Sequence, residues 1–289
     1  MKRILIQLDT DAQPSTFDRV VAVDAEVDEV FSYGGVTPET VEPLVHGAMF
    51  TRGPRELQST AIFVGGSNVP DGVRLLEKIQ GTFFGPVRVS VMMDSNGSNT
   101  TAAAAVLVAA KHLPLKGAQA VVFGGTGPVG QRVAELLARQ GTAVRLASRS
   151  LQRAQQTCDV IAAAVEDARL TPCMTETAKG LEEACRGVTL IVSAGAAGVE
   201  FLSEERRKSI DTLAVAIDLN AVPPAGLAGV SVTDKALAQE GVVCYGAIGV
   251  GGAKMKIHKA ALKMLFASND QVLDTTAIFR IGEELLAAE

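Results

Sequence analysis

Short apolar runs alternate with segments of helical periodicity along the N-terminal third of the chain. The runs predict strands at residues 4–8, 60–64 and 87–92. Between them, residues 38–50 and 69–83 have apolar positions every three or four residues, which is typical of amphipathic helices. Such alternation favours a parallel sheet built from β-α-β units. We therefore expect an α/β domain over residues 1–98.

A second alternating series begins after a polar stretch at residues 94–99, where Asn99 is expected to cap a helix over residues 100–111. Its strands are predicted at residues 120–123, 143–147, 190–193, 213–219 and 242–245. This order indicates a Rossmann-type, doubly wound parallel sheet within residues 99–269. Helices at 254–266 and 275–287 should follow, the C-terminal one within 270–289 completing the first domain. The full expectation is two α/β domains with a cleft between them.

Composition and charge exclude several classes of function. The net charge is −5 and the 27 basic residues are dispersed, which is unlike a nucleic-acid-binding surface. No targeting signal precedes the first strand and no run of about 18 apolar residues occurs, so we expect a cytoplasmic protein with no membrane partner. Four cysteines without C-x-x-C spacing and three scattered histidines predict free thiols and no metal site.

A glycine-rich loop stands between the strand at 120–123 and a helix at 129–139. It consists of Gly125, Thr126, Gly127, Pro128, Val129 and Gly130. In this context Gly125 is expected to permit a tight turn, Gly127 to let the backbone approach a pyrophosphate, and Gly130 to allow close helix packing. The N–H groups of the helix would face the anion, so the loop predicts a dinucleotide site.

The second strand of this unit ends in Ser148, Arg149 and Ser150 rather than in an acidic residue. An arginine and two hydroxyls suit the 2′-phosphate of NADP, whereas an NAD-selective site usually has Asp or Glu there. The pattern therefore favours NADP and leaves NAD use open. Ala194, Gly195 and Asn220 follow later strands and are expected near the nucleotide. Simple turns remain the alternative, with Asp218 as a cap or loop carboxylate.

Lys254 and His258 are four residues apart on a predicted helix and therefore share one face with Ala261 and Leu265. This spacing is compatible with a pair of ligand-binding side chains. It is equally compatible with a lysine that reaches water and a histidine with a structural partner.

Several blocks together resemble one family over essentially the whole chain. They are residues 9–18, which contain Phe17, and residues 58–66, 94–101 and 251–258. With the glycine-rich loop, they are similar to the bacterial NAD(P)-dependent methylene-tetrahydromethanopterin dehydrogenases. The resemblance implies oxidation of methylene-tetrahydromethanopterin to the methenyl cation in the one-carbon metabolism of formaldehyde. It also implies a fold related to methylene-tetrahydrofolate dehydrogenases, a pterin held between the domains, and a homotrimer.

The resemblance also assigns residues to the pterin site. Phe17, Thr101, Lys254 and His258 correspond by position to residues around the pterin and the reacting carbon. The segment at 148–150 differs from the Gly-Arg-Lys form of the strictly NADP-dependent branch, so exclusive NADP use stays open. When a methylene group between two nitrogens loses hydride, it leaves a cation delocalised over both nitrogens. No proton has to be removed, so positioning of the reactants should dominate catalysis, and Lys254 is not expected to act as a base.

Three other functions remain as alternatives. A methylene-tetrahydrofolate dehydrogenase would perform the same reaction on another carrier. A shikimate-like or amino-acid dehydrogenase would need an acid/base group. A non-catalytic NADP-binding sensor would need only the nucleotide site, and the polar blocks at 94–101 and 254–258 weigh against it.

Overall fold

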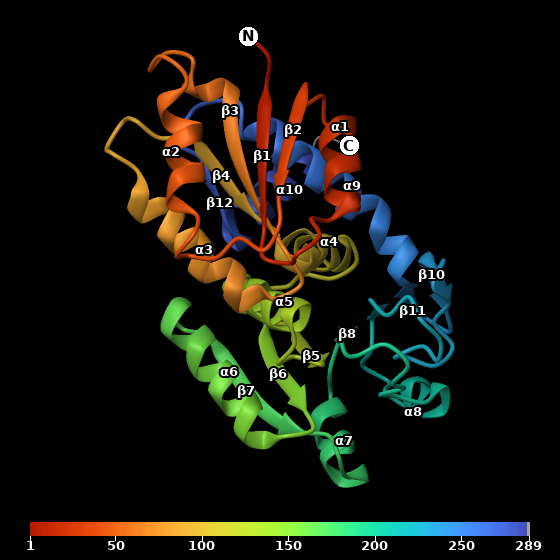
Figure 1. Cartoon of the computed structure of the whole chain (residues 1–289). Helices are drawn as coiled ribbons and strands as arrows, with labels where there is room; N and C mark the ends of the chain where they lie inside the picture. The colour runs from red at the N-terminus through yellow and green to blue at the C-terminus, as the bar shows by residue number, and fades with distance from the viewer. Residues whose placement is uncertain (288–289) are drawn as a thin grey trace. The chain divides into compact units, whose positions relative to one another are not determined.

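The computed structural model describes residues 1–287 and contains two compact units (Figure 1). The first comprises residues 1–100 and the described part of 255–289, and the second comprises residues 101–254. Helices α4 (Ser98–Ala110) and α9 (Ala247–Met264) each run from one unit into the other. The last two residues of the helical segment predicted at 270–289 lie outside the described residues. The pterin-binding role predicted for the first unit stays a prediction.

The first unit is built on a five-stranded parallel sheet with the order β12-β4-β3-β1-β2. Its strands are β1 (Ile4–Asp9), β2 (Glu29–Tyr33), β3 (Thr60–Gly65), β4 (Ser90–Met93) and β12 (Val272–Leu273). Every residue of β3 and β4 is buried, which explains why these strands are continuous apolar runs. The helical elements are α1 (Thr16–Asp24), α2 (Glu42–Phe50), η1 (Leu57–Ser59), α3 (Val69–Thr82), η2 (Ser95–Gly97) and α10 (Thr275–Ala287).

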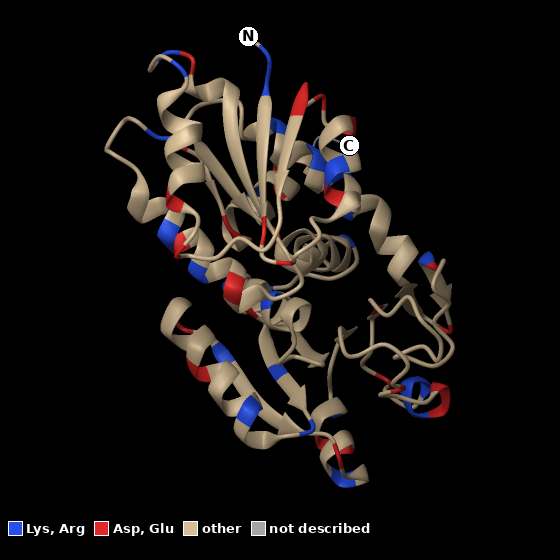
Figure 2. Cartoon of the chain, viewed as in Figure 1, with Lys and Arg blue, Asp and Glu red and all other residues tan. Residues whose placement is uncertain are grey.

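The helices of this unit cover both faces of its sheet. In Figure 1, α2 and α3 lie on one side, while α1 and the end of α9 lie on the other. A hydrogen-bonded ion pair of 2.8 Å between Lys263 Nζ and Glu26 Oε1 joins α9 to the chain that follows α1. Both signs of charge are spread over helices and loops rather than gathered in one band, as Figure 2 shows. A parallel sheet needs helices on both sides because both of its faces are apolar.

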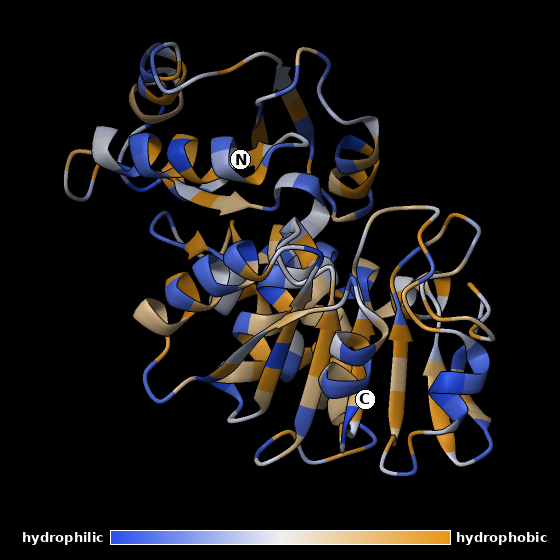
Figure 3. Cartoon of the chain, turned by 90° about the horizontal axis from the view of Figure 1, so that it is seen from below, coloured by the Kyte–Doolittle hydropathy of each residue, from blue (hydrophilic) through white to orange (hydrophobic). Residues whose placement is uncertain are grey.

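The second unit has a seven-stranded sheet with the order β10-β11-β9-β8-β5-β6-β7. The strands are β5 (Gln119–Phe123), β6 (Ala143–Ser148), β7 (Arg169–Met174), β8 (Leu190–Ser193), β9 (Val215–Asp218), β10 (Lys235–Gln239) and β11 (Val242–Tyr245). Its helices are α5 (Pro128–Arg139), α6 (Leu151–Ala164), α7 (Ala178–Cys185) and α8 (Glu204–Lys208). Only β10 is antiparallel to its neighbour among these strands. The inner strands are largely hydrophobic (Figure 3).

Strand order reverses between β5 and β8, because the chain first adds β6 and β7 on one side and then β8 and β9 on the other. In doubly wound sheets, ligands bind at such a switch point, beyond the carboxyl ends of the strands. The predicted α/β class with a Rossmann-type doubly wound sheet and a second α/β unit is therefore confirmed.

The start of α9 differs from the sequence prediction, since the helix begins at Ala247 rather than near residue 254. Three glycines in the first turns obscured the helical pattern. A Cβ atom at Gly249 would lie only 1.8 Å from the backbone oxygen of Asp234. Gly249 thus lets α9 approach the backbone of Asp234 closely, although glycine has a low helix propensity.

The prediction that Asn99 caps α4 was wrong. Asn99 lies inside the helix, and its side chain donates to Met93 O at 2.7 Å and accepts from Thr275 Oγ1 at 2.8 Å. The capping group is Asp94, whose Oδ1 accepts from the backbone N–H groups of Asn99 and Thr100 at 2.9 and 3.1 Å. A buried carboxylate therefore satisfies the first turn of α4, and Asn99 ties the helix to β4 and to the beginning of α10.

Within residues 1–287, no helix combines the length and the apolar character needed to span a bilayer. That same part of the chain contains no group of three or more His, Cys, Asp or Glu side chains arranged to hold a metal ion.

Candidate functional site

The loop between β5 and α5 has its left-handed residue at Gly124, one position before the predicted motif. Gly124 has φ of 66°, and a Cβ atom there would lie 2.4 Å from Gly195 Cα. Gly125 was expected to supply the tight turn, and this role was wrongly placed. A Cβ at Gly125 would instead lie 2.6 Å from Leu146 Cγ, so Gly125 permits packing against β6. Gly124 stands directly before the glycine-rich motif at residues 125–130 and is not part of it.

The other two motif glycines have different surroundings. A Cβ at Gly130 would lie 2.3 Å from the backbone oxygen of Gly124, so close packing of α5 on the loop requires glycine. At Gly127 the same atom would lie 3.2 Å from Gly124 O and 3.8 Å from Ala194 O. Gly127 also has an ordinary backbone conformation, with φ of −83° and ψ of 169°. Folding therefore explains glycine at 130 better than glycine at 127.

The N-terminus of α5 offers an anion-binding surface. Gly127 is the N-cap and provides no capping side chain, and Pro128 occupies the first helical turn. Thr126 and Val129 beside it are half-buried. The N–H groups of a first helical turn and the helix dipole both favour a bound phosphate.

The residues at the end of β6 divide into two kinds. Ser148 Oγ accepts from the backbone N–H of Ser150 at 3.3 Å, and Ser150 Oγ accepts from the backbone N–H of Arg153 at 3.3 Å as the N-cap of α6. Both hydroxyls retain a proton that they can donate. Arg149 between them is exposed. This segment can therefore present a guanidinium and two hydroxyl donors to an anion.

The remaining predicted nucleotide residues follow β8 and β9. Ala194 and Gly195 are half-buried, and a Cβ at Gly195 would lie 2.0 Å from Phe201 Cζ, so packing alone accounts for this glycine. The Asn220 N–H donates to Asp218 Oδ1 at 3.1 Å, and Asn220 Nδ2 donates to Pro224 O at 3.2 Å. Asp218 Oδ2 accepts from the Leu227 N–H at 3.0 Å, so the carboxylate of Asp218 at the end of β9 holds the loop that follows this strand.

Two of the predicted pterin-site residues come together in the first unit. The Phe17 and His258 ring centroids are 6.4 Å apart, with an interplanar angle of 37°. His258 also stacks on Phe63, with the ring centroids 5.8 Å apart and an interplanar angle of 19°. His258 is 0% exposed and Phe63 is 1% exposed, whereas Phe17 is 50% exposed. Phe17 therefore presents an aromatic surface to solvent, supported by two buried rings.

Phe63 is a residue that the sequence reasoning missed as a site candidate. It lies within the similar block at 58–66, but nothing in the local pattern distinguishes it from an ordinary buried residue of β3. Thr101 and Lys254 belong to the second unit and are both half-buried. Lys254 precedes His258 by one turn of α9, so the two residues share a helix face as predicted.

The thiols do not contribute nucleophiles near neutral pH. All four cysteines are free. Burial raises the pKa of Cys158 and of Cys185 to about 11, and raises the pKa of Cys173 and Cys244 in the same direction. Because the thiolate is the reactive form, these side chains behave as small apolar residues.

Comparison with known proteins gives the chain its family. It is 43% identical over 98% of its length to the "Bifunctional protein MdtA" of Methylorubrum extorquens, of which 99% is covered. It is 32% identical to a second protein of that organism, the "NAD(P)-dependent methylenetetrahydromethanopterin dehydrogenase", with 94% of each chain covered. The chain belongs to the methylene-tetrahydromethanopterin dehydrogenase family. A family model described as the N-terminal part of methylene-tetrahydromethanopterin dehydrogenase also matches residues 16–96.

Two solved structures share the fold of this chain. Quinate dehydrogenase from Corynebacterium glutamicum in complex with NAD aligns with a TM-score of 0.52, 14% identity and 99% coverage of both chains. A 5-ketofructose reductase of Gluconobacter sp. aligns with a TM-score of 0.51, also at 14% identity and 99% coverage of both chains. At this identity the likeness concerns the fold alone.

Proposed function

We propose that this family member catalyses hydride transfer from methylene-tetrahydromethanopterin to NADP, producing methenyl-tetrahydromethanopterin in the oxidation of formaldehyde. The observation that carries the proposal is similarity over 94% of the chain to a relative named NAD(P)-dependent methylenetetrahydromethanopterin dehydrogenase. The family match at residues 16–96 supports the pterin side, because this segment lies outside the dinucleotide loop. NAD remains part of the proposal as a second acceptor.

The residues after β5 and β6 fit a dinucleotide phosphate. The first turn of α5 would hold the pyrophosphate, and the absence of a side chain at its N-cap Gly127 would let the backbone approach closely. Arg149 would bind the 2′-phosphate in a charge-assisted contact, with the Ser148 and Ser150 hydroxyls as further donors. The nicotinamide supplies a carbon that accepts hydride.

On the pterin side, the chain's part is to bind and orient. Phe17 offers an exposed ring on which a flat pterin can stack, and the buried rings of His258 and Phe63 hold it in place. Thr101 and Lys254 would hydrogen-bond the polar edge of the pterin. Because loss of hydride leaves a cation shared by two nitrogens, none of these side chains has to remove a proton. Holding the reacting carbons in near-attack geometry contributes up to about 7–11 kcal/mol in favourable systems.

Steady-state kinetics with purified protein tests this proposal. Methylene-tetrahydromethanopterin and methylene-tetrahydrofolate are offered separately, each with NADP or NAD, and the near-ultraviolet absorbance of reduced nicotinamide is followed. The proposal expects the highest kcat/KM with methylene-tetrahydromethanopterin and NADP. Preference for methylene-tetrahydrofolate would move the assignment to that carrier. Activity only with quinate, shikimate or an amino acid would exclude the proposal, and nucleotide binding without turnover of any of these compounds would favour a sensor.

A homotrimer and a cytoplasmic location belong to the proposal and rest on the family resemblance. Light scattering coupled to size-exclusion chromatography should give three times the mass of 30.1 kDa. A monomer or dimer across a range of concentrations would contradict the assembly while leaving the reaction untouched.

A further inference from the structure

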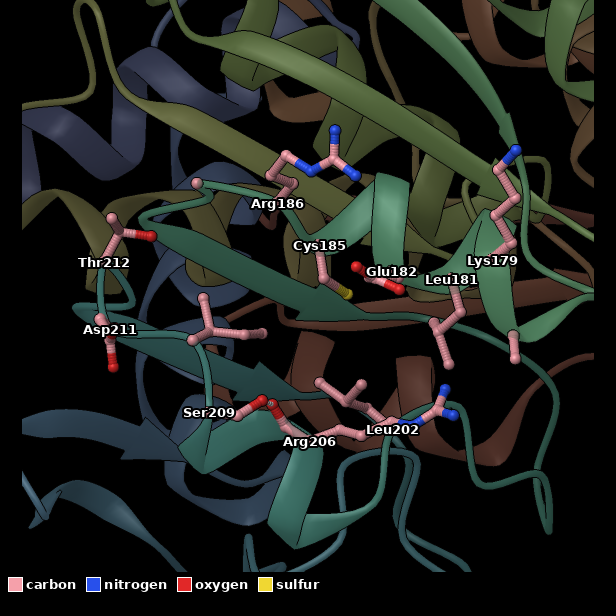
Figure 4. Close-up of a pocket in the computed structure, with 13 residues that line it drawn as sticks. Lys179, Leu181, Glu182, Cys185, Arg186, Leu202, Arg206, Ser209, Asp211 and Thr212 are labelled. Carbon is pink, nitrogen blue, oxygen red and sulfur yellow. Dashed lines mark hydrogen bonds between the residues drawn. The ribbon is translucent and has the colours of Figure 1, made fainter.

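We propose that the second unit contains a separate small-molecule site, specific for an amphipathic organic anion, in a pocket between α7 and α8 (Figure 4). The pocket has a volume of about 640 Å³. Its lining comes from α7, from α8 and from the loops that lead into β8 and β9. None of the predicted nucleotide or pterin residues is among the lining residues.

Part of the pocket's lining lies beside the amino ends of strands, away from the proposed nucleotide residues. Gly187 and Thr212 line it, and these residues precede the first residues of β8 and β9. The nucleotide residues instead follow the carboxyl ends of β5, β6, β8 and β9. A strand separates its two ends by about 3.3 Å per residue, so a ligand at one edge leaves the other edge free.

The floor of the pocket is apolar. Leu181, Cys185, Leu202 and Ile210 line it from both sides, and the Cys185 sulfur points inward in Figure 4. Leu202 and Cys185 are buried members of the hydrophobic core, so the floor is held by the fold rather than by mobile side chains. Ligand sites typically combine a volume of roughly 300–1,000 Å³, a mainly apolar lining and a few polar groups.

The polar rim contains both signs of charge. Lys179, Arg186 and Arg206 provide cations, and Glu182 and Asp211 provide carboxylates. Lys179 pairs with Glu183 at 4.0 Å. In the part of the chain that the structure describes, no ion pair occupies the guanidinium of Arg186 or of Arg206. Two arginines are therefore available to an incoming anion.

Two arginines lie near the Cys185 thiol at the floor of the pocket. Burial raises the pKa of this thiol, and Arg145 and Arg206 both act in the lowering direction, as positive charges do. Arg145 donates to the backbone oxygens of Glu183 and Ala184 at 3.4 and 3.0 Å, which are neutral acceptors. Two guanidinium groups without an ion pair among the described residues thus stand beside an apolar floor, which favours a ligand with an apolar body and a carboxylate or sulfonate.

Fluorescence titration with anilinonaphthalene sulfonate, an apolar ring system with one anionic group, tests the site. The full chain is titrated with saturating NADP present, so that the nucleotide site cannot bind the probe. Arg206→Gln should weaken probe binding about ten- to a hundredfold, the range for loss of a charge-assisted contact. Lys208→Gln is the matched control, because Lys208 lies on the same helix, carries the same charge and does not line the pocket. It should change the affinity less than about twofold.

Three results would overturn the site. The probe could fail to bind while NADP is saturating, the two variants could behave alike, or the probe could bind only after dilution dissociates an oligomer. The last result would make this face a contact between copies of the chain. Both variants should retain the NADP-linked activity of the parent protein, so failure of this site is distinguishable from failure of the proposed reaction.

Discussion

Replacement of Gly127 should separate nucleotide binding from folding. In Gly127→Ala the new Cβ lies 3.2 Å from Gly124 O and 3.8 Å from Ala194 O, and the backbone conformation suits any residue. The neighbouring oxygen has to move by only a few tenths of an ångström. The free energy of unfolding should therefore change by less than about 1 kcal/mol. The added methyl group nevertheless occupies the space in which a pyrophosphate would approach the loop.

We expect Gly127→Ala to weaken NADP binding about a hundredfold, which corresponds to about 2.7 kcal/mol. Gly127→Val should abolish binding. Gly130→Ala is the contrasting variant, because its Cβ would lie 2.3 Å from Gly124 O and 2.9 Å from Gly125 Cα, both backbone atoms. The helix has to shift, and overpacking of this kind costs about 1–3 kcal/mol of folding stability.

Calorimetric titration with NADP and denaturant unfolding of the free protein measure the two quantities separately. A folded Gly127→Val variant with unchanged NADP affinity would refute the assignment of this loop to the pyrophosphate. Full stability of Gly130→Ala would refute the close packing of α5 on Gly124.

Three further predictions address specificity, positioning and pH. Arg149→Ala should raise KM for NADP about ten- to a hundredfold more than KM for NAD, and an equal effect on both would remove the 2′-phosphate role. Phe17→Leu should lower kcat or raise KM for the pterin at least tenfold, while the affinity for NADP stays nearly constant. The pH profile of the parent enzyme should not be bell-shaped, and a bell-shaped profile that His258→Gln flattens would indicate proton transfer instead. Burial raises the pKa of Cys158 and Cys185 from 9.0 to about 11, because the folded protein disfavours the charged thiolate. Their contribution to folding stability is therefore fully present below pH 9.0 and is lost as the pH rises towards about 11. The free energy of unfolding should fall by about 2 kcal/mol per thiol over this pH range. In Cys185→Ala the fall should be smaller by the amount due to one thiol, and the same dependence of the unfolding free energy on pH as in the parent protein would contradict this prediction.

The buried strands could be predicted from the sequence because burial on both faces leaves a continuous apolar run. β3 and β8 have this character and were predicted within a residue of their observed ends. β2 and β7 escaped prediction, since they lie at sheet edges and alternate exposed with partly buried positions. Edge strands are specified by pairing with a neighbour, which no local pattern encodes.

The candidate site shows the same limit. The glycine-rich loop is local, so its motif could be located. Glycine at 124, however, is required by the close approach of Gly195, which lies in a segment distant in sequence. The stacking of Phe63 on His258 joins segments far apart in the chain. Helical spacing could place Lys254 and His258 on one face, but only the fold brings Phe17 to the imidazole.

The most direct test of the central claim follows the hydride itself. Methylene-tetrahydromethanopterin with two deuterium atoms on the methylene carbon is incubated with the protein and NADP, and the reduced nucleotide is analysed by mass spectrometry. Direct transfer predicts one deuterium atom in each NADPH formed and one retained on the methenyl carbon. Reduced nucleotide without deuterium, or no reduced nucleotide from a folded protein that binds NADP, would contradict the proposed reaction.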